Sequence, residues 1–174
     1  MKNRLVAITV LCLFVSTLCF AQKTSIDWNR GADFSSYHTY MWEASPNPAK
    51  GEWNQRIIDD IDKQLQAKGL TKVDSNPDVW VVYSNSIQHD KQVVGVGYVG
   101  GGGLPLTGAS PTSHATFVYK VGTLVVEIAD TKTKQLVWRG AVSDTLSDKQ
   151  NKNITTLDKA VTKLFRSYPP KDKK

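Results

Sequence analysis

The stretch that decides the fold runs from residue 122 to residue 141, and reads GTLVVEIA (122–129), DTKTK (130–134) and QLVWRGA (135–141). Two apolar, β-branched runs separated by a short polar segment predict an antiparallel hairpin. Alternation of side chains along the two strands assigns one set of residues to the core face, namely Leu124, Val126, Ile128, Leu136 and Trp138. Glu127 and Arg139 then fall together on the opposite face.

Two amphipathic helices flank this region. The first begins near Glu52, and its apolar residues recur at helical spacing, at Trp53, Ile57, Ile61 and Leu65. Gly69 is placed as a left-handed cap, with Leu70 positioned to contact Leu65 across the turn. The second helix repeats the same spacing close to the C-terminus, at Leu157, Ala160, Val161 and Leu164. Asn153 or Thr155 is its expected N-cap, and Pro169 follows its end.

Three further segments read as strands. Residues 37–42 are aromatic and β-branched, residues 78–83 are apolar on both pleat faces, and residues 113–119 are again strand-like. Trp53, Trp80 and Trp138 all lie on apolar stripes, so we expect all three in the core. The order of strands and helices predicts an α+β two-layer sandwich, with a mainly antiparallel sheet and two helices packed on one face.

The N-terminus has the pattern of a secretory signal peptide over residues 1–21. Two basic residues precede an apolar run, and small side chains lead to an expected cleavage between Ala21 and Gln22. One alternative is an uncleaved anchor helix, although the apolar run is shorter than a membrane span. Another is lipidation at Cys19, which the preceding Leu18 disfavours.

The mature chain, residues 22–174, is expected to form a single domain. Both cysteines, Cys12 and Cys19, precede it, so an exported product would carry no disulfide. Loss of Lys2 and Arg4 lowers the formal charge from +6 to +4, with 20 basic against 16 acidic residues. No basic patch with interleaved aromatics predicts nucleic-acid binding, and no integral membrane segment is expected after signal removal.

The sequence offers no convincing catalytic, cofactor-binding or metal site. Residues 95–100, GVGYVG, match a dinucleotide fingerprint, but the glycines and proline that follow cannot begin the helix this motif needs. The three histidines, His38, His89 and His114, do not stand at metal-ligand spacing. Three acids on the first helix are interleaved with basic residues, as on a solvated face, namely Asp59, Asp60 and Asp62.

The segments that carry the fold also carry a family likeness. DFSSYHTYMW (33–42), LQAKGL (65–70), NPDVWVVY (76–83), GTLVVEIAD (122–130) and LVWRG (136–140) resemble the bacterial family termed domain of unknown function 4136. That resemblance covers nearly the whole mature chain. It implies export to the cell envelope, in many members as lipoproteins, and it supplies no activity and no site residues.

These observations favour a non-enzymatic periplasmic or cell-envelope protein that binds an envelope protein or polymer. The expected binding elements are a sheet edge or the glycine-rich segment 95–108, with Tyr98 and Leu104 as contact residues. A carrier holding a small molecule or lipid between sheet and helices is the alternative. A hydrolase is third, and it would need a Ser or His with an acidic neighbour lining a cleft, which proximity of His89 or His114 to Asp90 would indicate.

Overall fold

The computed structural model describes residues 23–96 and 113–170. Its elements in chain order are β1 (Lys23–Trp28), the 3-10 turn η1 (Phe34–Ser36), β2 (Thr39–Trp42), α2 (Glu52–Ala67), β3 (Thr71–Lys72), β4 (Val79–Val96), β5 (Ser113–Asp130), β6 (Leu136–Leu146) and α3 (Gln150–Phe165).

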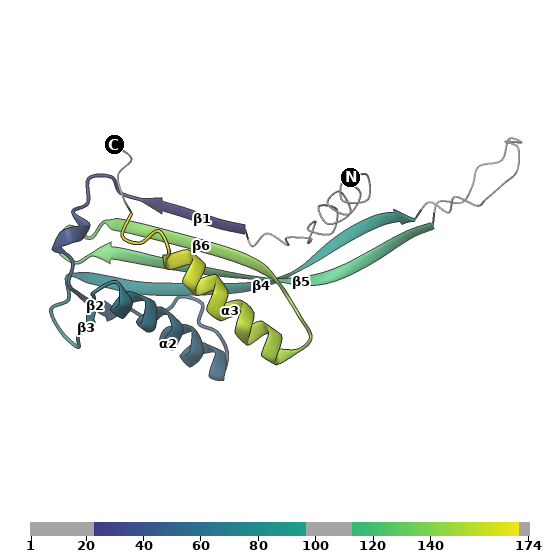
Figure 1. Cartoon of the computed structure of the whole chain (residues 1–174), viewed down its shortest axis with the longest axis horizontal. Coiled ribbons are helices and arrows are strands. Elements are labelled where there is room, and N and C mark those ends of the chain that lie inside the picture. Colours follow the sequence, from purple (N-terminus) through teal and green to yellow (C-terminus); the bar gives the residue numbers. More distant parts are fainter. Residues whose placement is uncertain (1–22, 97–112, 171–174) are drawn as a thin grey trace, which may run out of the picture.

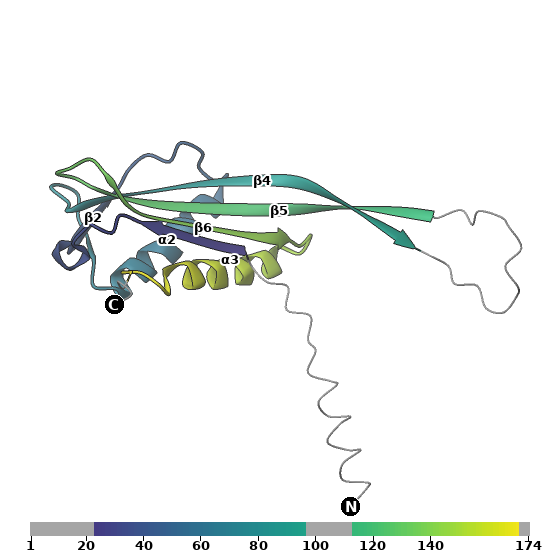
Figure 2. The same cartoon turned by 90° about the horizontal axis from the view of Figure 1, so that it is seen from above.

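The strands form one mixed sheet in the order β1-β6-β5-β4-β2-β3. The pairs β1–β6, β6–β5 and β5–β4 are antiparallel, whereas β4–β2 and β2–β3 are parallel. Both helices lie on the same face of the sheet, with their N-terminal ends toward the protruding part of β4 and β5 (Figures 1 and 2). The predicted α+β two-layer sandwich is therefore confirmed.

The core lies between the sheet and the two helices. The sheet contributes alternate residues of its helix-covered face, namely Tyr40, Val79, Val81, Tyr83, Leu124, Val126, Ile128, Trp138 and Val142. The helices contribute Ile57, Ile61 and Leu65 from α2, and Ala160, Val161, Leu164 and Phe165 from α3. Trp138 is fully buried, as predicted, and its ring packs against Phe165 and Tyr168 at centroid distances of 5.2 and 5.4 Å. Aromatic rings therefore fill the centre of the domain.

The decisive hairpin forms as predicted except at one position. Glu127 pairs with Arg139 on the face away from the helices, and their charged atoms are 3.4 Å apart. The prediction that Leu136 belongs to the core was wrong, because this side chain is 46% exposed. A β-bulge between Ile128 and Ala129 shifts the register, and Val137 is buried instead.

Of the two helix caps predicted from the sequence, the structure confirms the one at the end of α2. Gly69 has a φ of 89°, and the N–H of Leu70 donates to the carbonyl of Leu65, which is the predicted cap of α2. For α3 the predicted N-cap was wrong, because the helix begins earlier, at Gln150. Asn153 lies inside its first turn, where its amide both accepts from Ser147 N and donates to Ser147 O.

One face of the sheet has no layer over it among the described residues. Trp80 was predicted to lie in the core, but it projects from this open face and is only partly buried. The ammonium of Lys134 lies 3.9 Å from the centroid of its ring, a cation–π contact at the surface. The apolar pattern on both faces of residues 78–83 therefore does not mark a strand covered on both sides in this chain.

Candidate functional site

The most unusual part of the fold is a two-stranded arm formed by the outer halves of β4 and β5. Beyond the bridge at Ser84, no described strand pairs with the outer edge of β4, and β6 pairs with β5 only from Lys120 onward. The arm extends well past both helices (Figures 1 and 2). Ile87 and Val118 lie on its helix-side face and are 60% and 57% exposed.

A groove opens where the arm meets the body of the domain. It has a volume of about 550 Å³ and lies between the N-terminal halves of α2 and α3, over β4, β5 and β6. Apolar side chains from all these elements line it, among them Trp53, Ile57, Leu124, Leu146, Leu157 and Ala160. Gly122 forms part of its floor, where an added Cβ would lie 3.0 Å from the side chain of Leu146.

Polar side chains at the edge of the groove hold its walls in place. The side-chain amides of Asn47 and Asn85 each donate to the backbone carbonyl of the other residue, which joins the segment before α2 to β4. The amide of Asn153 donates to the carbonyl of Ser147 and accepts from the N–H of the same residue. Of the described residues that line the groove, only Lys50 and Asp144 carry a charge.

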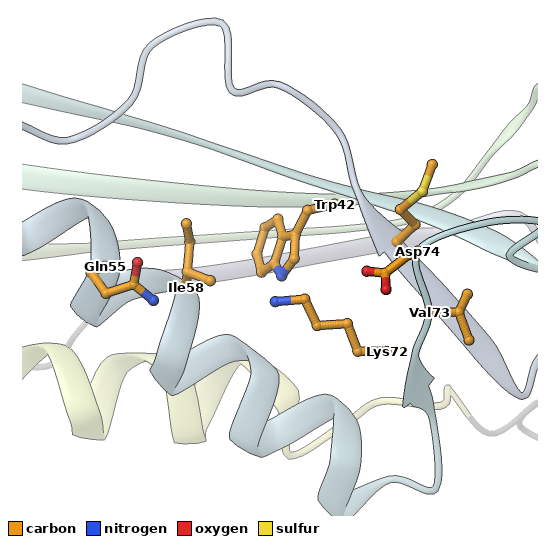
Figure 3. A pocket seen from close by; sticks show the side chains of 7 residues that line it. Trp42, Gln55, Ile58, Lys72, Val73 and Asp74 are labelled. Carbon is orange, nitrogen blue, oxygen red and sulfur yellow. The ribbon is translucent and has the colours of Figure 1, made fainter.

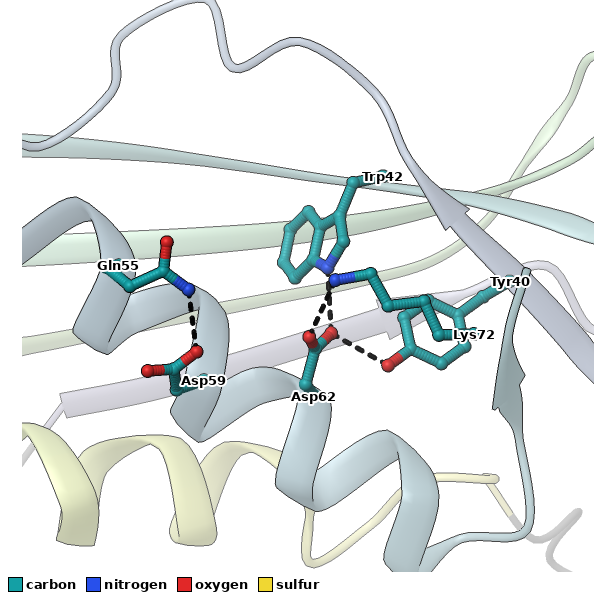
Figure 4. Close-up of polar contacts among 6 residues, drawn as sticks. All are labelled: Tyr40, Trp42, Gln55, Asp59, Asp62 and Lys72. Carbon is teal, nitrogen blue, oxygen red and sulfur yellow. Dashed lines mark hydrogen bonds and ion pairs between the residues drawn. The ribbon is translucent and has the colours of Figure 1, made fainter. Parts of the chain in front are cut away.

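A second polar cluster ties α2 to the edge strands. Asp62 accepts hydrogen bonds from Tyr40 Oη and Trp42 Nε1, both at 2.7 Å, and forms an ion pair with Lys72 at 3.0 Å (Figure 4). Burial and the neighbouring carboxylate raise the pKa of Tyr40. The prediction that Asp62 belongs to a solvated helix face was wrong, because its side chain is only 15% exposed.

Beside this cluster lies a hollow of about 380 Å³, lined by Trp42, Gln55, Ile58, Lys72 and Asp74 among others (Figure 3). Lys72 extends toward the Trp42 indole (Figure 3). Its ammonium donates a hydrogen bond to Asp62 (Figure 4). The carboxylate already has three donors, and its hydrogen-bonding capacity is largely satisfied. This arrangement fastens α2 to β2 and β3.

Asp60 of α2 lies beside Asp158, an acidic residue of α3. Burial of Asp60 is the largest cause that raises its pKa, and the hydrogen bond and negative charge of Asp158 on α3 add to it. Together they raise the pKa of Asp60 to about 6. Its Oδ2 atom is buried, and no donor of the described chain reaches it. The sequence placed Asp60 on a solvated face, and this was also wrong.

His38 and His89 are not brought into a shared site, and the side chain of His114 lies outside the described part of the chain. His38 Nδ1 lies 3.0 Å from the carbonyl of Ser36 in an exposed turn, and His89 is exposed on the arm. The carboxylate of Asp90 accepts from Tyr119 Oη at 3.3 Å, on the strand opposite. Within residues 23–96 and 113–170, no group of three or more potential metal ligands occurs.

The other site predictions fall outside the described residues. This applies to the signal cleavage at Ala21 and Gln22, and to the expected contact residues Tyr98 and Leu104. Sequence reasoning missed the groove, because its lining residues come from six separate segments. Trp53 was expected in the core, yet it is only partly buried and lines this groove. None of the helices in the described part has both the length and the apolar character that a membrane span requires.

Comparison with solved structures identifies similar folds. A PDZ domain protein from Parabacteroides distasonis is similar with a TM-score of 0.56 at 15% identity. The similarity covers 86% of this chain and 36% of that one, so the present chain spans about a third of its length. PelC from Paraburkholderia phytofirmans, which was solved as a dodecamer, is similar with a TM-score of 0.51 at 8% identity, over 83% of this chain and 95% of PelC.

At such identities the likeness establishes the fold alone. No curated protein matches the chain. A family model does match, over residues 24–170, and this confirms the resemblance seen in the sequence. The chain therefore belongs to the family described as Domain of unknown function (DUF4136).

Proposed function

We propose that this chain is an exported, non-enzymatic binding module of the cell envelope, which pairs with a strand of a protein partner along the β4–β5 arm. The observation that carries the proposal is the arm itself. It extends past the helix layer, its outer edges have no strand partner among the described residues, and it exposes Ile87 and Val118 on one face.

A bare two-stranded ribbon is marginally stable in water, and its unpaired N–H and C=O groups form a template for another strand. Strand addition would satisfy the backbone groups of one edge, and main-chain hydrogen bonds of this kind supply affinity in many peptide complexes. Ile87 and Val118 lie on the same face, because their cross-strand partners are Gly122 and Lys91 in a continuous register. A partner side chain above that face would cover both residues.

A protein partner is favoured over a polymer, because the arm offers backbone donors and acceptors at strand spacing. The polar clusters of the body support a non-enzymatic role, since Asp62 is engaged by Tyr40, Trp42 and Lys72. Export rests on the signal pattern of residues 1–21. Fractionation of cells, with mass measurement of the purified product, tests it. We expect a periplasmic protein that begins at Gln22, and a lipid-modified Cys19 would contradict this.

Crosslinking in cells tests the partner site. A photoreactive amino acid at Val118 should capture a discrete protein, whereas the same residue at Leu136 should not. Leu136 is a matched control, because it is also apolar and 46% exposed but lies at the opposite end of β5 and β6. PelC, which has a similar fold, was solved as a dodecamer, so capture of a second copy of this chain must be distinguished from capture of another protein. The mass of the crosslinked species should therefore be compared with that of two copies of this chain.

A charged substitution gives a second readout. Val118→Asp should abolish capture from a photoreactive residue at position 87 and leave the melting temperature within about 2 °C, since exposed positions seldom change stability by more than about 0.5 kcal/mol. Equal capture from positions 118 and 136, or capture that survives Val118→Asp, would show that the arm is not the binding element.

A further inference from the structure

The groove at the root of the arm is a second surface whose chemistry is unassigned. It lies between the helices and the sheet, so it differs from the strand edges invoked above. Its volume of about 550 Å³ falls within the usual range for small-ligand pockets, and such pockets are mostly apolar with a few polar groups. We propose that the groove binds the hydrocarbon chain of an amphiphile, of the fatty acyl class, and leaves the headgroup at its rim.

The walls favour hydrocarbon. Trp53, Leu146 and Leu157 all line the groove, and each is only partly buried. Their apolar surface facing the groove remains in contact with water, and a hydrocarbon chain would remove both surfaces from water at once. Gly122 keeps the floor open, because a side chain there would approach Leu146 to 3.0 Å.

The edge of the groove does not favour a polar ligand. The amides of Asn47, Asn85 and Asn153 each donate to a backbone carbonyl, and these bonds fix the orientation of the three side chains against the walls of the groove. The two charged residues of the lining, Lys50 and Asp144, have opposite signs. The rim therefore does not discriminate between ligands by the charge of the headgroup. Affinity must instead depend on the hydrocarbon chain.

The groove also has an apolar continuation. Ile87 contributes to the lining and is 60% exposed, so the apolar surface runs from the interior of the groove onto the arm. A longer chain can therefore cover Ile87 after it has filled the groove. Affinity should rise with chain length, by about fourfold for each enclosed methylene, and level off once the chain passes this residue.

Calorimetry with the purified full-length exported protein tests the proposal. The probes are decanoate, dodecanoate and tetradecanoate, together with alkyltrimethylammonium ions of the same chain lengths, all as monomers in solution. We expect affinity to rise about fourfold per methylene, and to differ by less than about threefold between the two headgroups at equal length.

Two variants and one control locate the site. Leu146→Trp should fill the groove and weaken dodecanoate binding at least tenfold. Val118→Trp adds the same side chain to the same face outside the groove, and should leave binding unchanged. Ile87→Asp alters an exposed residue, so folding is not at risk, and it should weaken tetradecanoate binding more than decanoate binding.

Four results would overturn the proposal. These are affinity that follows headgroup charge without regard to chain length, equal effects of Leu146→Trp and Val118→Trp, binding insensitive to both Leu146→Trp and Ile87→Asp, and failure of every probe to bind. Should every probe fail while Leu146→Trp abolishes self-association of the protein, a second copy of this chain is the occupant. Loss of crosslinking at the arm would leave these binding data intact, so the two proposals fail separately.

Discussion

Gly140 provides a sharp test of the packing between sheet and helices. It lies on β6 beneath the ring of Trp138, and an added Cβ would be 2.5 Å from Trp138 Cη2 and 2.7 Å from Leu164 Cδ1. Carbon atoms in contact prefer about 3.5 to 4.0 Å, so Gly140→Ala requires a shift of about 1 Å. Phe165 and Tyr168 hold the Trp138 ring on its other sides, at 5.2 and 5.4 Å between centroids.

Overpacking of this kind usually costs about 1 to 3 kcal/mol, and the number of close contacts here places Gly140→Ala near 3 kcal/mol. For a domain of this size such a loss lowers the melting temperature by roughly 6 to 12 °C. The matched control is Gly122→Ala on the neighbouring strand and the same face, where the new Cβ meets the Leu146 side chain at 3.0 to 3.2 Å. Leu146 is partly exposed and can rotate away.

We therefore expect Gly122→Ala to change stability by less than about 1 kcal/mol. Urea unfolding followed by tryptophan fluorescence measures both variants. Equal losses at the two positions would show that replacing glycine in these strands has a general cost, unrelated to the Trp138 ring. Wild-type stability for Gly140→Ala would mean that the ring is not confined as described.

Two further substitutions test the faces of the sheet and the contact between the helices. Trp138→Ala should cost about 3 to 5 kcal/mol, as for other buried aromatics, whereas Arg139→Ala should cost no more than a few tenths, because its ion pair is exposed; equal tolerance in urea unfolding would contradict the assigned faces. Asp60 takes up a proton on folding, because burial and Asp158 raise its pKa to about 6 from an ordinary value of 3.8. The folded state therefore loses stability as pH rises from about 4 through 6, and Asp60→Asn should be about 1 kcal/mol more stable than wild type at pH 7.5, after allowance for solvent screening, and equal to it at pH 4. An advantage that is the same at every pH would rule out ionisation of Asp60 as its cause.

Local patterns in the sequence predicted those parts of the fold that local physics determines. The helical spacing from Trp53 to Leu65, closed by Gly69, predicted α2 and its cap, because a glycine is needed where φ is positive. Strand alternation likewise placed Glu127 and Arg139 on the same face, and the structure shows that they are cross-strand partners. Leu136 was misplaced because a bulge reverses the alternation, and no residue type in the turn marks it.

The candidate sites depend on contacts between distant segments, and these were not predictable from one sequence. Asp62 resembles any acid on an exposed helix face until β2 and β3 bring Tyr40, Trp42 and Lys72 to it. The groove similarly needs both helices and three strands in place. An apolar, partly buried Trp53 could have indicated it, but a pattern cannot distinguish a side chain that fills a core from one that lines a cavity.

The position of Asn85 and Ile87 has one more consequence. These residues of β4 line the groove and also begin the arm, and Asn85 is joined to the groove wall through Asn47. A strand that pairs with the arm and a ligand that fills the groove would therefore contact the same short piece of backbone. Linkage requires such an influence to be reciprocal. If the ligand changes the affinity for the partner by some factor, the partner changes the affinity for the ligand by the same factor. The junction would then work as a two-way thermodynamic coupling between the far end of the arm and the interior of the domain.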